Sequence, residues 1–294
     1  MSAALHIALT GAGPRIAPPA PPALEALLLH RRVEEAALLV PRIFNLCRAA
    51  QSLGARVALG LPARPEDRAA LADEILRDHL MRFFVLWPRA LGLPPAPLPG
   101  DDIARAVFGP PGRCPAPDAF DRWLVAGAGV APVLAALAGR FAPGEAVADL
   151  PPADPGPALD AAAEENSPWL RHRTSPLLAE IEARYGRGPL WRAAARLVDL
   201  EACLSGQFPA TPATRGGVVR VPAARGTYSL SARVEDGRVA AFRRLTPTDH
   251  LCARGGVLQR ALESLPRGRA DLAPLVVDIL DPCVPVVFDE AAHA

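Results

Sequence analysis

The chain has 294 residues, and its charges nearly cancel, with 32 basic side chains against 31 acidic ones. Every basic residue is an arginine, and no basic run is interleaved with aromatic residues, which argues against a nucleic-acid-binding role. No uncharged apolar run of about 18 residues occurs, so no membrane span is expected. The start lacks a signal-peptide pattern, and five scattered cysteines without a C-x-x-C pair favour a reducing, cytoplasmic environment.

The first half of the sequence shows mainly helical periodicity. In chain order the pattern predicts a short strand and then three helical segments, over residues 5–9, 22–59, 65–87 and 119–140. Pro88 is expected to stop the second of these helical segments. Proline- and glycine-rich connectors at about 88–118 and 142–160 have neither the length nor the polarity of a domain boundary. We therefore expect residues 1–294 to form one domain.

The second half changes from helical to alternating periodicity. Residues 175–204 are predicted to be helical with a glycine interruption, and residues 227–245 to form two strands around Asp236-Gly237, a strong hairpin signal. Residues 257–265 resemble a short helix. The fold class predicted from the sequence is therefore α+β, mainly helical, with a small antiparallel hairpin or sheet near 217–245.

The register of that hairpin predicts which residues meet at its open end. With a two-residue turn, Ala232 faces Ala241 on the opposite strand. The same register, continued past the strands, brings Arg225 near Thr248. Two polar residues that are distant in sequence are thus expected to lie together.

Two cysteines stand in informative contexts. Cys47 follows Phe44 at helical spacing, on the apolar face, where a buried structural thiol is the ordinary interpretation. Cys283 follows Asp281 and a proline, which resembles the opening of a helical turn with Asp281 as the cap. Such a position favours the thiolate, the form that binds metals. The remaining cysteines carry no such context and are interpreted as structural: Cys114, Cys203 and Cys252.

The stretches around these two cysteines resemble the active-site motifs of nickel-iron hydrogenase large subunits. Those motifs are R-x-C-G-x-C-x-x-x-H near the N-terminus and D-P-C-x-x-C-x-x-H near the C-terminus. Arg42 and Cys47 match the first motif, and Asp281, Pro282 and Cys283 match the second. The remaining cysteine and histidine positions of the two motifs are occupied by other residues: Phe44, Gln51, Val286 and Asp289.

Three further stretches resemble the same large subunits in the same order. Residues 78–84 are similar to a D-H-x-x-H-F-Y helix, with Arg82 in place of the second histidine. Residues 224–226 are similar to a P-R-G segment whose arginine faces the cyanide ligands of the iron. Residues 235–248 resemble an "EDGKI … PTTWN" hairpin, with His250 and the following leucine replacing Trp-Asn.

This pattern of lost ligands resembles the HupK/HoxV family of hydrogenase accessory proteins. The resemblance implies that Cys47 and Cys283 transiently bind iron as Fe(CN)2(CO), without nickel. It also implies that Arg225 donates a hydrogen bond to a cyanide nitrogen, with Thr248 as the candidate second donor. Two thiolates suffice for a low-spin iron that carries three diatomic ligands, whereas a nickel-iron centre needs four.

The leading hypothesis is a non-enzymatic scaffold whose partners are maturation chaperones and the hydrogenase large subunit. It predicts that Cys47 and Cys283 lie within common reach of one metal. One alternative is a metal-free protein that occupies a maturation chaperone's large-subunit interface. Another is an unusual catalytic subunit, which Phe44 and Val286 argue against. Large subunits usually carry a C-terminal extension that is removed after nickel insertion, and the short tail after Cys283 leaves no room for one.

Overall fold

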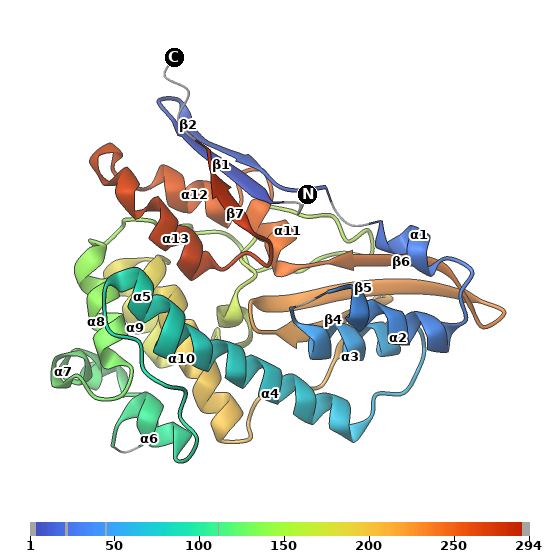
Figure 1. The fold of residues 1–294 in the computed structure, drawn as a ribbon, viewed down its shortest axis with the longest axis horizontal. Helices are drawn as coiled ribbons and strands as arrows, with labels where there is room; N and C mark the ends of the chain where they lie inside the picture. Colours follow the sequence, from blue (N-terminus) through green and yellow to red (C-terminus); the bar gives the residue numbers. More distant parts are fainter. Residues whose placement is uncertain (1–3, 21–22, 45, 111, 290–294) are drawn as a thin grey trace.

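A computed structural model describes residues 4–20, 23–44, 46–110 and 112–289, and helices dominate it (Figure 1). The first half contains the helices α1 (Leu24–Leu28), α2 (Val33–Ile43), α3 (Arg48–Ala58), α4 (Pro65–Met81), α5 (Trp87–Leu91), α6 (Ile103–Phe108), α7 (Phe120–Ala126) and α8 (Ala131–Arg140). The second half contains α9 (Pro176–Tyr185), α10 (Pro189–Leu204), α11 (Pro247–Cys252), α12 (Val257–Glu263) and α13 (Ala273–Leu280). The predicted break within 175–204 is confirmed, because residues 186–188 separate α9 from α10.

The predicted hairpin forms two strands of a four-stranded antiparallel sheet. Its strands, in the spatial order of the sheet, are β3 (Ala213–Arg215), β4 (Val218–Ala223), β5 (Gly226–Glu235) and β6 (Arg238–Leu245). Asp236 and Gly237 both take positive φ at the turn, as the Asp-Gly signal predicts. A β-bulge beside Val234 shifts the register by one residue. Ala232 therefore faces Phe242, and the predicted pairing with Ala241 is wrong.

A second sheet, which the sequence did not predict, joins the two ends of the chain. It contains β2 (Gly13–Ala17), β1 (Leu5–Thr10) and β7 (Val286–Phe288), with β7 parallel to β1. Leu5 N–H donates to the Pro285 carbonyl at 2.8 Å, and Asp289 N–H donates to the Ile7 carbonyl at 2.9 Å. The segment after Cys283 is thus held by the N-terminal strand, and the two ends lie at one side of the molecule (Figure 1).

Pro88 does not stop the long helix, contrary to the prediction. Between α4 and α5 the chain makes a π-helical turn over Arg82–Leu86, and helical geometry continues to Leu91. A proline inside a helix leaves the carbonyl four residues earlier without a donor. That carbonyl, of Phe84, accepts instead from Ala96 N–H at 2.8 Å in the following loop. The helix tolerates Pro88 because a residue outside the helix supplies the missing hydrogen bond.

Helical structure over 119–140 is confirmed, but as two helices rather than one. Gly129 between them has φ 59°, and a Cβ there would lie 2.2 Å from the Val107 carbonyl, so a side chain is sterically excluded. The first predicted connector is also less irregular than expected, because it contains α6.

In the described part of the chain, no single helix is long and apolar enough to cross a membrane. One helix pair, Pro117–Ala126 with Ala131–Arg140, meets that test jointly, but the pair is bent by 98°.

The buried apolar residues form two main clusters that meet along α4. One cluster packs α2 and α3 against β4, β5 and β6, and α4 contributes Leu71 and Ile75 to it. The other gathers β1, α5, α8, α10, α12 and α13, and receives Leu80 from the far end of α4 and Phe83 from the π-helical turn that follows. Figure 1 shows α4 running from one cluster to the other. The single-domain expectation stays a prediction.

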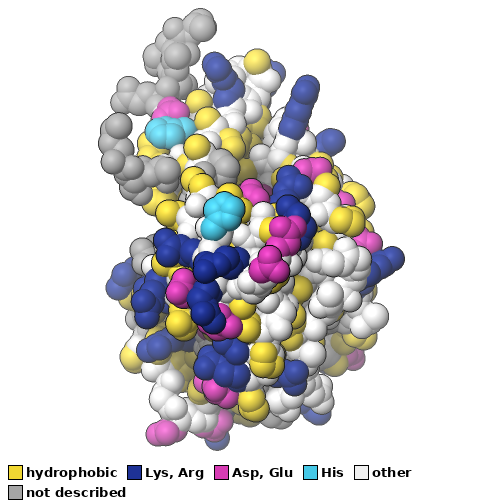
Figure 2. All heavy atoms as spheres, turned by 90° about the vertical axis from the view of Figure 1, so that its right-hand side faces the viewer, with side chains coloured by type: hydrophobic (Ala, Val, Ile, Leu, Met, Phe, Trp, Pro, Cys, Tyr) yellow, Lys and Arg dark blue, Asp and Glu magenta, His cyan; other side chains and the backbone are white. Residues whose placement is uncertain are grey.

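The surface at the β5–β6 turn carries charges of both signs. Figure 2 shows arginine side chains gathered on this side with acidic side chains among them. Arg32 lies 3.7 Å from Glu34, and Arg233 forms an ion pair with Glu235. Acidic partners therefore accompany some of the arginines on this face.

Candidate functional site

Three chain segments meet where the two clusters join. Cys47 immediately precedes α3, and Arg225 lies between β4 and β5. Asp281 ends α13, and Cys283 stands in the turn that leads to β7. All of these side chains are half-buried or buried. The site is therefore built from residues near the beginning, the last third and the end of the chain.

Cys47 is not inside a helix, contrary to the periodicity-based expectation. Helix α2 ends at Ile43, and Cys47 adopts the left-handed conformation with φ 54° as the residue that caps α3. Arg225 Nη1 donates a hydrogen bond to its sulfur at 3.5 Å. Burial raises the pKa of Cys47 to about 12, although the charge of Arg225 acts in the opposite direction. In the free protein the group is a neutral thiol at pH 7, and a bound metal would have to displace its proton.

Cys283 is held by Thr248 rather than by a helix. Asp281 is the left-handed C-terminal cap of α13, with φ 56°, and no helical turn follows it, so its predicted role as an N-cap is wrong. Cys283 N–H donates to Thr248 Oγ1 at 3.0 Å, and its sulfur lies 2.8 Å from the same oxygen. Because that oxygen already accepts from the backbone, the hydroxyl hydrogen remains available for the sulfur.

Thr248 is positioned by a helix start that the sequence encodes. In T-P-T-D the Thr246 side chain accepts from Asp249 N–H at 3.2 Å, and the Asp249 carboxylate accepts from Thr246 N–H at 2.7 Å. This is a capping box, with Pro247 in the first helical position, where it fits best. His250 in the next turn is buried, and its Nδ1 faces the Ala162 carbonyl at 3.3 Å. The replacement of Trp-Asn by His250-Leu251 therefore leaves an ordered helix after Thr248.

Asp281 is the centre of the polar network. Its Oδ1 lies 2.5 Å from Arg82 Nη2 and 3.1 Å from Arg225 Nη2, and its Oδ2 lies 2.9 Å from Arg196 Nη2. Its backbone carbonyl also accepts from Arg225 Nε at 3.1 Å. Since the side chain is almost fully buried, these contacts replace the water that a carboxylate needs. They fix the turn that carries Cys283.

Asp78 on α4 completes the cluster from the other side. Its carboxylate lies 3.3 Å from Arg196 Nη1 and 3.6 Å from Arg225 Nη2. Burial disfavours its charge, but the two arginines outweigh burial and hold the pKa of Asp78 below its usual range. Conversely, burial disfavours the charge of Arg225, whereas Asp281 and Asp78 raise its pKa. The Arg225 guanidinium thus contacts both carboxylates and the Cys47 sulfur.

A buried histidine links this cluster to a second one. Arg196 Nη1 lies 3.2 Å from His79 Nδ1, and Asp199 Oδ2 lies 2.8 Å from His79 Nε2. Because arginine can only donate, Nδ1 must accept, and the ring proton sits on Nε2 and is donated to Asp199. Asp199 also contacts Arg171 and His172, and these groups hold its pKa well below the usual range despite complete burial. The network orients the inward face of α4 against α10.

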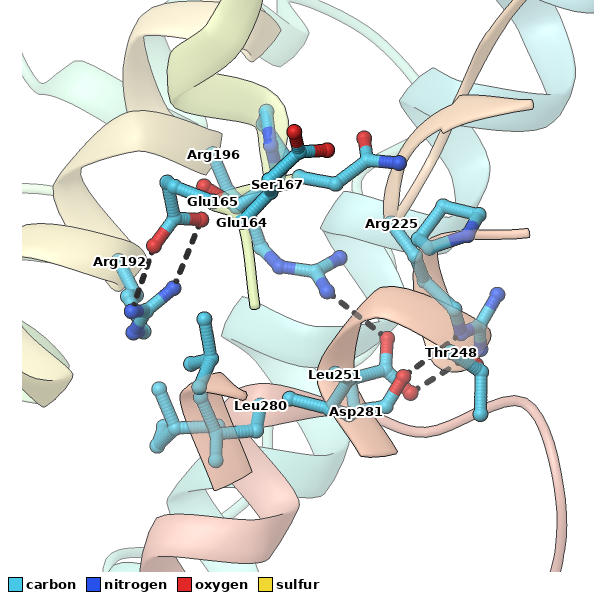
Figure 3. Close-up of a pocket in the computed structure, with 15 residues that line it drawn as sticks. Glu164, Glu165, Ser167, Arg192, Arg196, Arg225, Thr248, Leu251, Leu280 and Asp281 are labelled. Atoms are coloured by element: carbon cyan, nitrogen blue, oxygen red, sulfur yellow. Dashed lines mark hydrogen bonds and ion pairs between the residues drawn. The ribbon is translucent and has the colours of Figure 1, made fainter. Parts of the chain in front are cut away.

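A small polar cavity adjoins Arg225 and Thr248 (Figure 3). Its volume of about 30 Å³ has room for one or two water molecules. Figure 3 shows the buried Arg192–Glu165 pair across the cavity from Arg225, with Nη2 and Oε2 2.7 Å apart. Within the described residues, no group of three or more His, Cys, Asp and Glu side chains is arranged to hold a metal ion.

Comparison with known proteins decides the family. The chain is 51% identical, over the full length of both sequences, to "Hydrogenase expression/formation protein HupK" of Rhodobacter capsulatus. The chain belongs to the HupK family. No family model matches the sequence. The family name describes a role in forming hydrogenase, which is the role of this protein at that level of detail.

Solved structures show the fold of this family member. An oxygen-pressurised variant of [NiFeSe] hydrogenase from Desulfovibrio vulgaris Hildenborough matches with a TM-score of 0.59 at 14% identity, over 92% of each chain. The [NiFeSe] hydrogenase of Dm. baculatum matches with a TM-score of 0.54 at 11% identity, over 92% of this chain and 93% of that one. The predicted α+β fold resembling the hydrogenase large subunit is confirmed.

The motif positions that have lost their ligands serve other purposes in this HupK-family chain. The Phe44 ring lies 4.2 Å from the Arg244 guanidinium carbon. Gln51 is buried, donates to the Leu46 carbonyl at 2.9 Å and accepts from Tyr228 at 3.3 Å. At the C-terminal motif, Val286 begins β7, and Asp289 pairs with His6 at 2.9 Å. Each substitution contributes to packing or hydrogen bonding.

Sequence reasoning missed Arg196 and Asp199, which hold the site from behind. A signal was present, because Arg192 and Arg196 stand four residues apart in a helix whose neighbouring residues are nearly all apolar. Both arginines are almost fully buried. Buried arginines are rare unless paired, so this spacing indicates acidic partners. It did not indicate which acidic residues they were.

Proposed function

We propose that this protein holds an Fe(CN)2(CO) unit between Cys47 and Cys283 and passes it to a hydrogenase large subunit. The observation that supports this proposal most directly is the position of Arg225, which donates to the Cys47 sulfur and also contacts Asp281, two residues before Cys283, together with the HupK-family identity. The iron unit is the cargo of the protein, to be bound and released. The family identity supports a role in hydrogenase formation, and the binding and transfer of iron are our proposal.

The ligand set suits transfer better than permanent storage. Thiolates are soft ligands that suit low-spin iron. Three diatomic ligands and two thiolates leave one of six positions for a ligand from a donor or an acceptor protein. Because Cys47 is a neutral thiol in the free protein, binding must release its proton, so capture depends on pH. Loss of the iron would return that proton.

Arg225 is suited to recognise a cyanide ligand. Its guanidinium is buried, fixed by the Asp281 carbonyl and carboxylate, and directed through Nη1 at the Cys47 sulfur. An N–H group of a fixed cation is a strong donor for an anionic acceptor. The hydroxyl oxygen of Thr248, our sequence-based candidate for the second cyanide, contacts both the backbone N–H and the sulfur of Cys283 in the free protein. We therefore assign Thr248 to positioning of the Cys283 sulfur.

We further propose that the protein takes no nickel and is not a hydrogen-activating enzyme. Phe44 and Val286 occupy positions that would have to supply two more thiolates. Its partners would be the maturation chaperones that deliver iron and the large subunit that receives it, in the cytoplasm where hydrogenase subunits are assembled. The alternative, a metal-free protein that occupies a chaperone's large-subunit interface, remains the reading against which the iron proposal is tested.

The decisive experiment compares two cysteine variants of the full chain, co-expressed with hydrogenase maturation proteins. Infrared cyanide and carbonyl bands per protein measure loading, metal analysis measures iron and nickel, and melting checks the fold. Cys283→Ser should abolish the bands, because a serine hydroxyl is a harder ligand than a thiol and a weaker acid, so it holds low-spin iron poorly. Cys114→Ser is the matched control, since Cys114 contacts the Leu197 carbonyl at 3.7 Å and lies outside the site.

Three results would contradict the proposal. Equal loading of Cys283→Ser and Cys114→Ser would show that Cys283 is not a ligand. Stoichiometric nickel would favour an unusual enzyme. If the unmodified protein showed no cyanide or carbonyl bands yet bound a maturation chaperone tightly, the result would support the metal-free alternative.

A further inference from the structure

Arg82 is an arginine at the edge of the site whose hydrogen-bonding capacity is largely unused. It directly follows α4 and begins the π-helical turn that leads into α5. Its side chain is 14% exposed, and Nη2 contacts Asp281 Oδ1 at 2.5 Å. Arg225 Nη2 contacts the same oxygen, so two guanidinium groups converge on one carboxylate atom. Arg82 is thus a direct neighbour of the group that faces Cys47.

The three arginines of the cluster use their donors very differently. Arg225 donates to the Cys47 sulfur and to both the carbonyl and the carboxylate of Asp281. Arg196 contacts Asp78, His79, Asp281 and the Ala224 carbonyl. Arg82, by contrast, makes a single hydrogen bond within the described residues, although a guanidinium has five N–H groups. Its Nε is buried and has no partner in the described part of the chain.

The local backbone presents Arg82 at this place. A π-helical turn inserts an extra residue per turn, so side chains after Met81 are rotated away from the positions that a regular helix would give them. Such turns occur frequently at functional sites. Asp78, one turn earlier on α4, contacts Arg225 and Arg196. Residues 78 and 82 therefore present one acid and one arginine toward the same cluster.

An anionic ligand would use the donors that Arg82 leaves idle. Asp281 keeps Arg196 and Arg225 as partners without Arg82, so neutralising Asp281 does not by itself require a third guanidinium. A buried N–H without an acceptor is unfavourable, and an acceptor supplied by bound cargo would remove that cost. The proposed cargo carries two cyanides, whereas the Thr248 hydroxyl oxygen already contacts both the backbone N–H and the sulfur of Cys283.

We infer that Arg82 is the second cyanide-recognising residue, paired with Arg225 across Asp281. This inference rests on the proposed function and deepens it, since it assigns the recognition of both anionic ligands to arginines. In this arrangement Arg225 serves one cyanide and Arg82 the other. Arg82 acts through hydrogen bonds to the cyanide nitrogen and forms no bond to iron.

Infrared spectra of loaded variants test the inference. Arg82→Met keeps the apolar stem and removes every donor, and Arg82→Lys keeps a cation for Asp281 but lacks the Nε–H. Arg89→Met is the matched control, because Arg89 is exposed on the adjacent α5. We expect Arg82→Met to load about ten- to a hundredfold more weakly, the effect of losing one charge-assisted hydrogen bond. A hydrogen bond to the cyanide nitrogen raises the cyanide stretching frequency. In Arg82→Met, one of the two cyanide bands should therefore move to lower frequency.

The outcomes separate this inference from the proposed function. Suppose that the unmodified protein and Arg89→Met both load. If Arg82→Met then shows the same two cyanide bands at the same yield, this inference alone is overturned. If Arg82→Met fails to load and also melts lower, Arg82→Lys decides, and unaltered cyanide bands in that variant would refute the assignment. An unmodified protein without any cyanide band overturns the proposed function and this inference with it.

Discussion

Replacing Asp281 by asparagine isolates the charge at the centre of the site. Asparagine has nearly the same size and also tolerates the left-handed conformation, so φ 56° at this position imposes little additional cost. What changes is the carboxylate that three guanidinium nitrogens contact at 2.5, 2.9 and 3.1 Å. An amide offers one oxygen to these donors and turns its own N–H groups toward the others.

The expected cost follows from burial. Removing one partner of a buried ion pair costs about 3–5 kcal/mol. Arg196 and Arg225 keep Asp78 as a partner, so we expect a loss near the lower end, about 3 kcal/mol. For a chain of this size 1 kcal/mol corresponds to about 2 °C, so the melting temperature should fall by about 6 °C. Urea titration should show a lower midpoint with an unchanged slope.

The matched control is Asp271→Asn, the same substitution at an exposed aspartate just before α13. We expect it to change stability by less than about 0.5 kcal/mol. Melting curves followed by circular dichroism, with all three proteins under one set of conditions, make the comparison. If Asp281→Asn has the same melting temperature as Asp271→Asn, the stability of the arginine cluster does not depend on the Asp281 carboxylate. The account of how the Cys283 turn is fixed would then be wrong.

Three further predictions follow from the site and its surroundings. Burial lowers the pKa of His79, so as pH falls below about 6.5 the unfolded chain takes up a proton before the folded one does, and stability declines. His79→Gln should therefore lose less melting temperature between about pH 7.5 and 5 than the unmodified protein. Cys47, whose pKa is about 12, should carry about a thousandfold less thiolate than a free cysteine at neutral pH, and peptide mapping after brief iodoacetamide treatment should find it nearly unmodified. Gly226 has φ 149°, and a Cβ there would lie 2.3 Å from the Asn166 carbonyl. Gly226→Ala should therefore lower the free energy of unfolding by at least about 1–3 kcal/mol. Gly139→Ala, where a Cβ would meet open space, should not lower it.

Local signals in the sequence predicted the elements that depend on local chemistry. Asp236-Gly237 marked the hairpin because few other dipeptides accept two successive positive φ values. Gly186, which takes φ 77°, marked the break between α9 and α10. The order of short motifs along the chain correctly indicated the fold, and it led us to expect that Cys47, Arg225 and Cys283 belong to one site. Their roles toward iron stay predictions.

Features that depend on distant contacts were not predictable in this way. The strand β7 is three residues long, and it exists because β1, at the opposite end of the chain, supplies its hydrogen bonds. Cys47 and Asp281 take left-handed backbone conformations without being glycine, and Arg225 contacts both of them. Hydrophobic periodicity reports which side of a helix is buried, and it carries no information about a single residue that interrupts the helix.

The pairing of early and late segments also constrains when the site can exist. Arg82, Arg196 and Arg225 are all synthesised before Asp281, the carboxylate on which they converge. Ribosomes add about 5–20 residues per second, so the roughly 240 positions between Cys47 and Cys283 separate the two thiols by tens of seconds of translation. During that interval the nascent chain presents Cys47 without its counterpart. If the proposed iron unit needs both thiols, it can be captured only after Cys283 has been synthesised and has met Cys47.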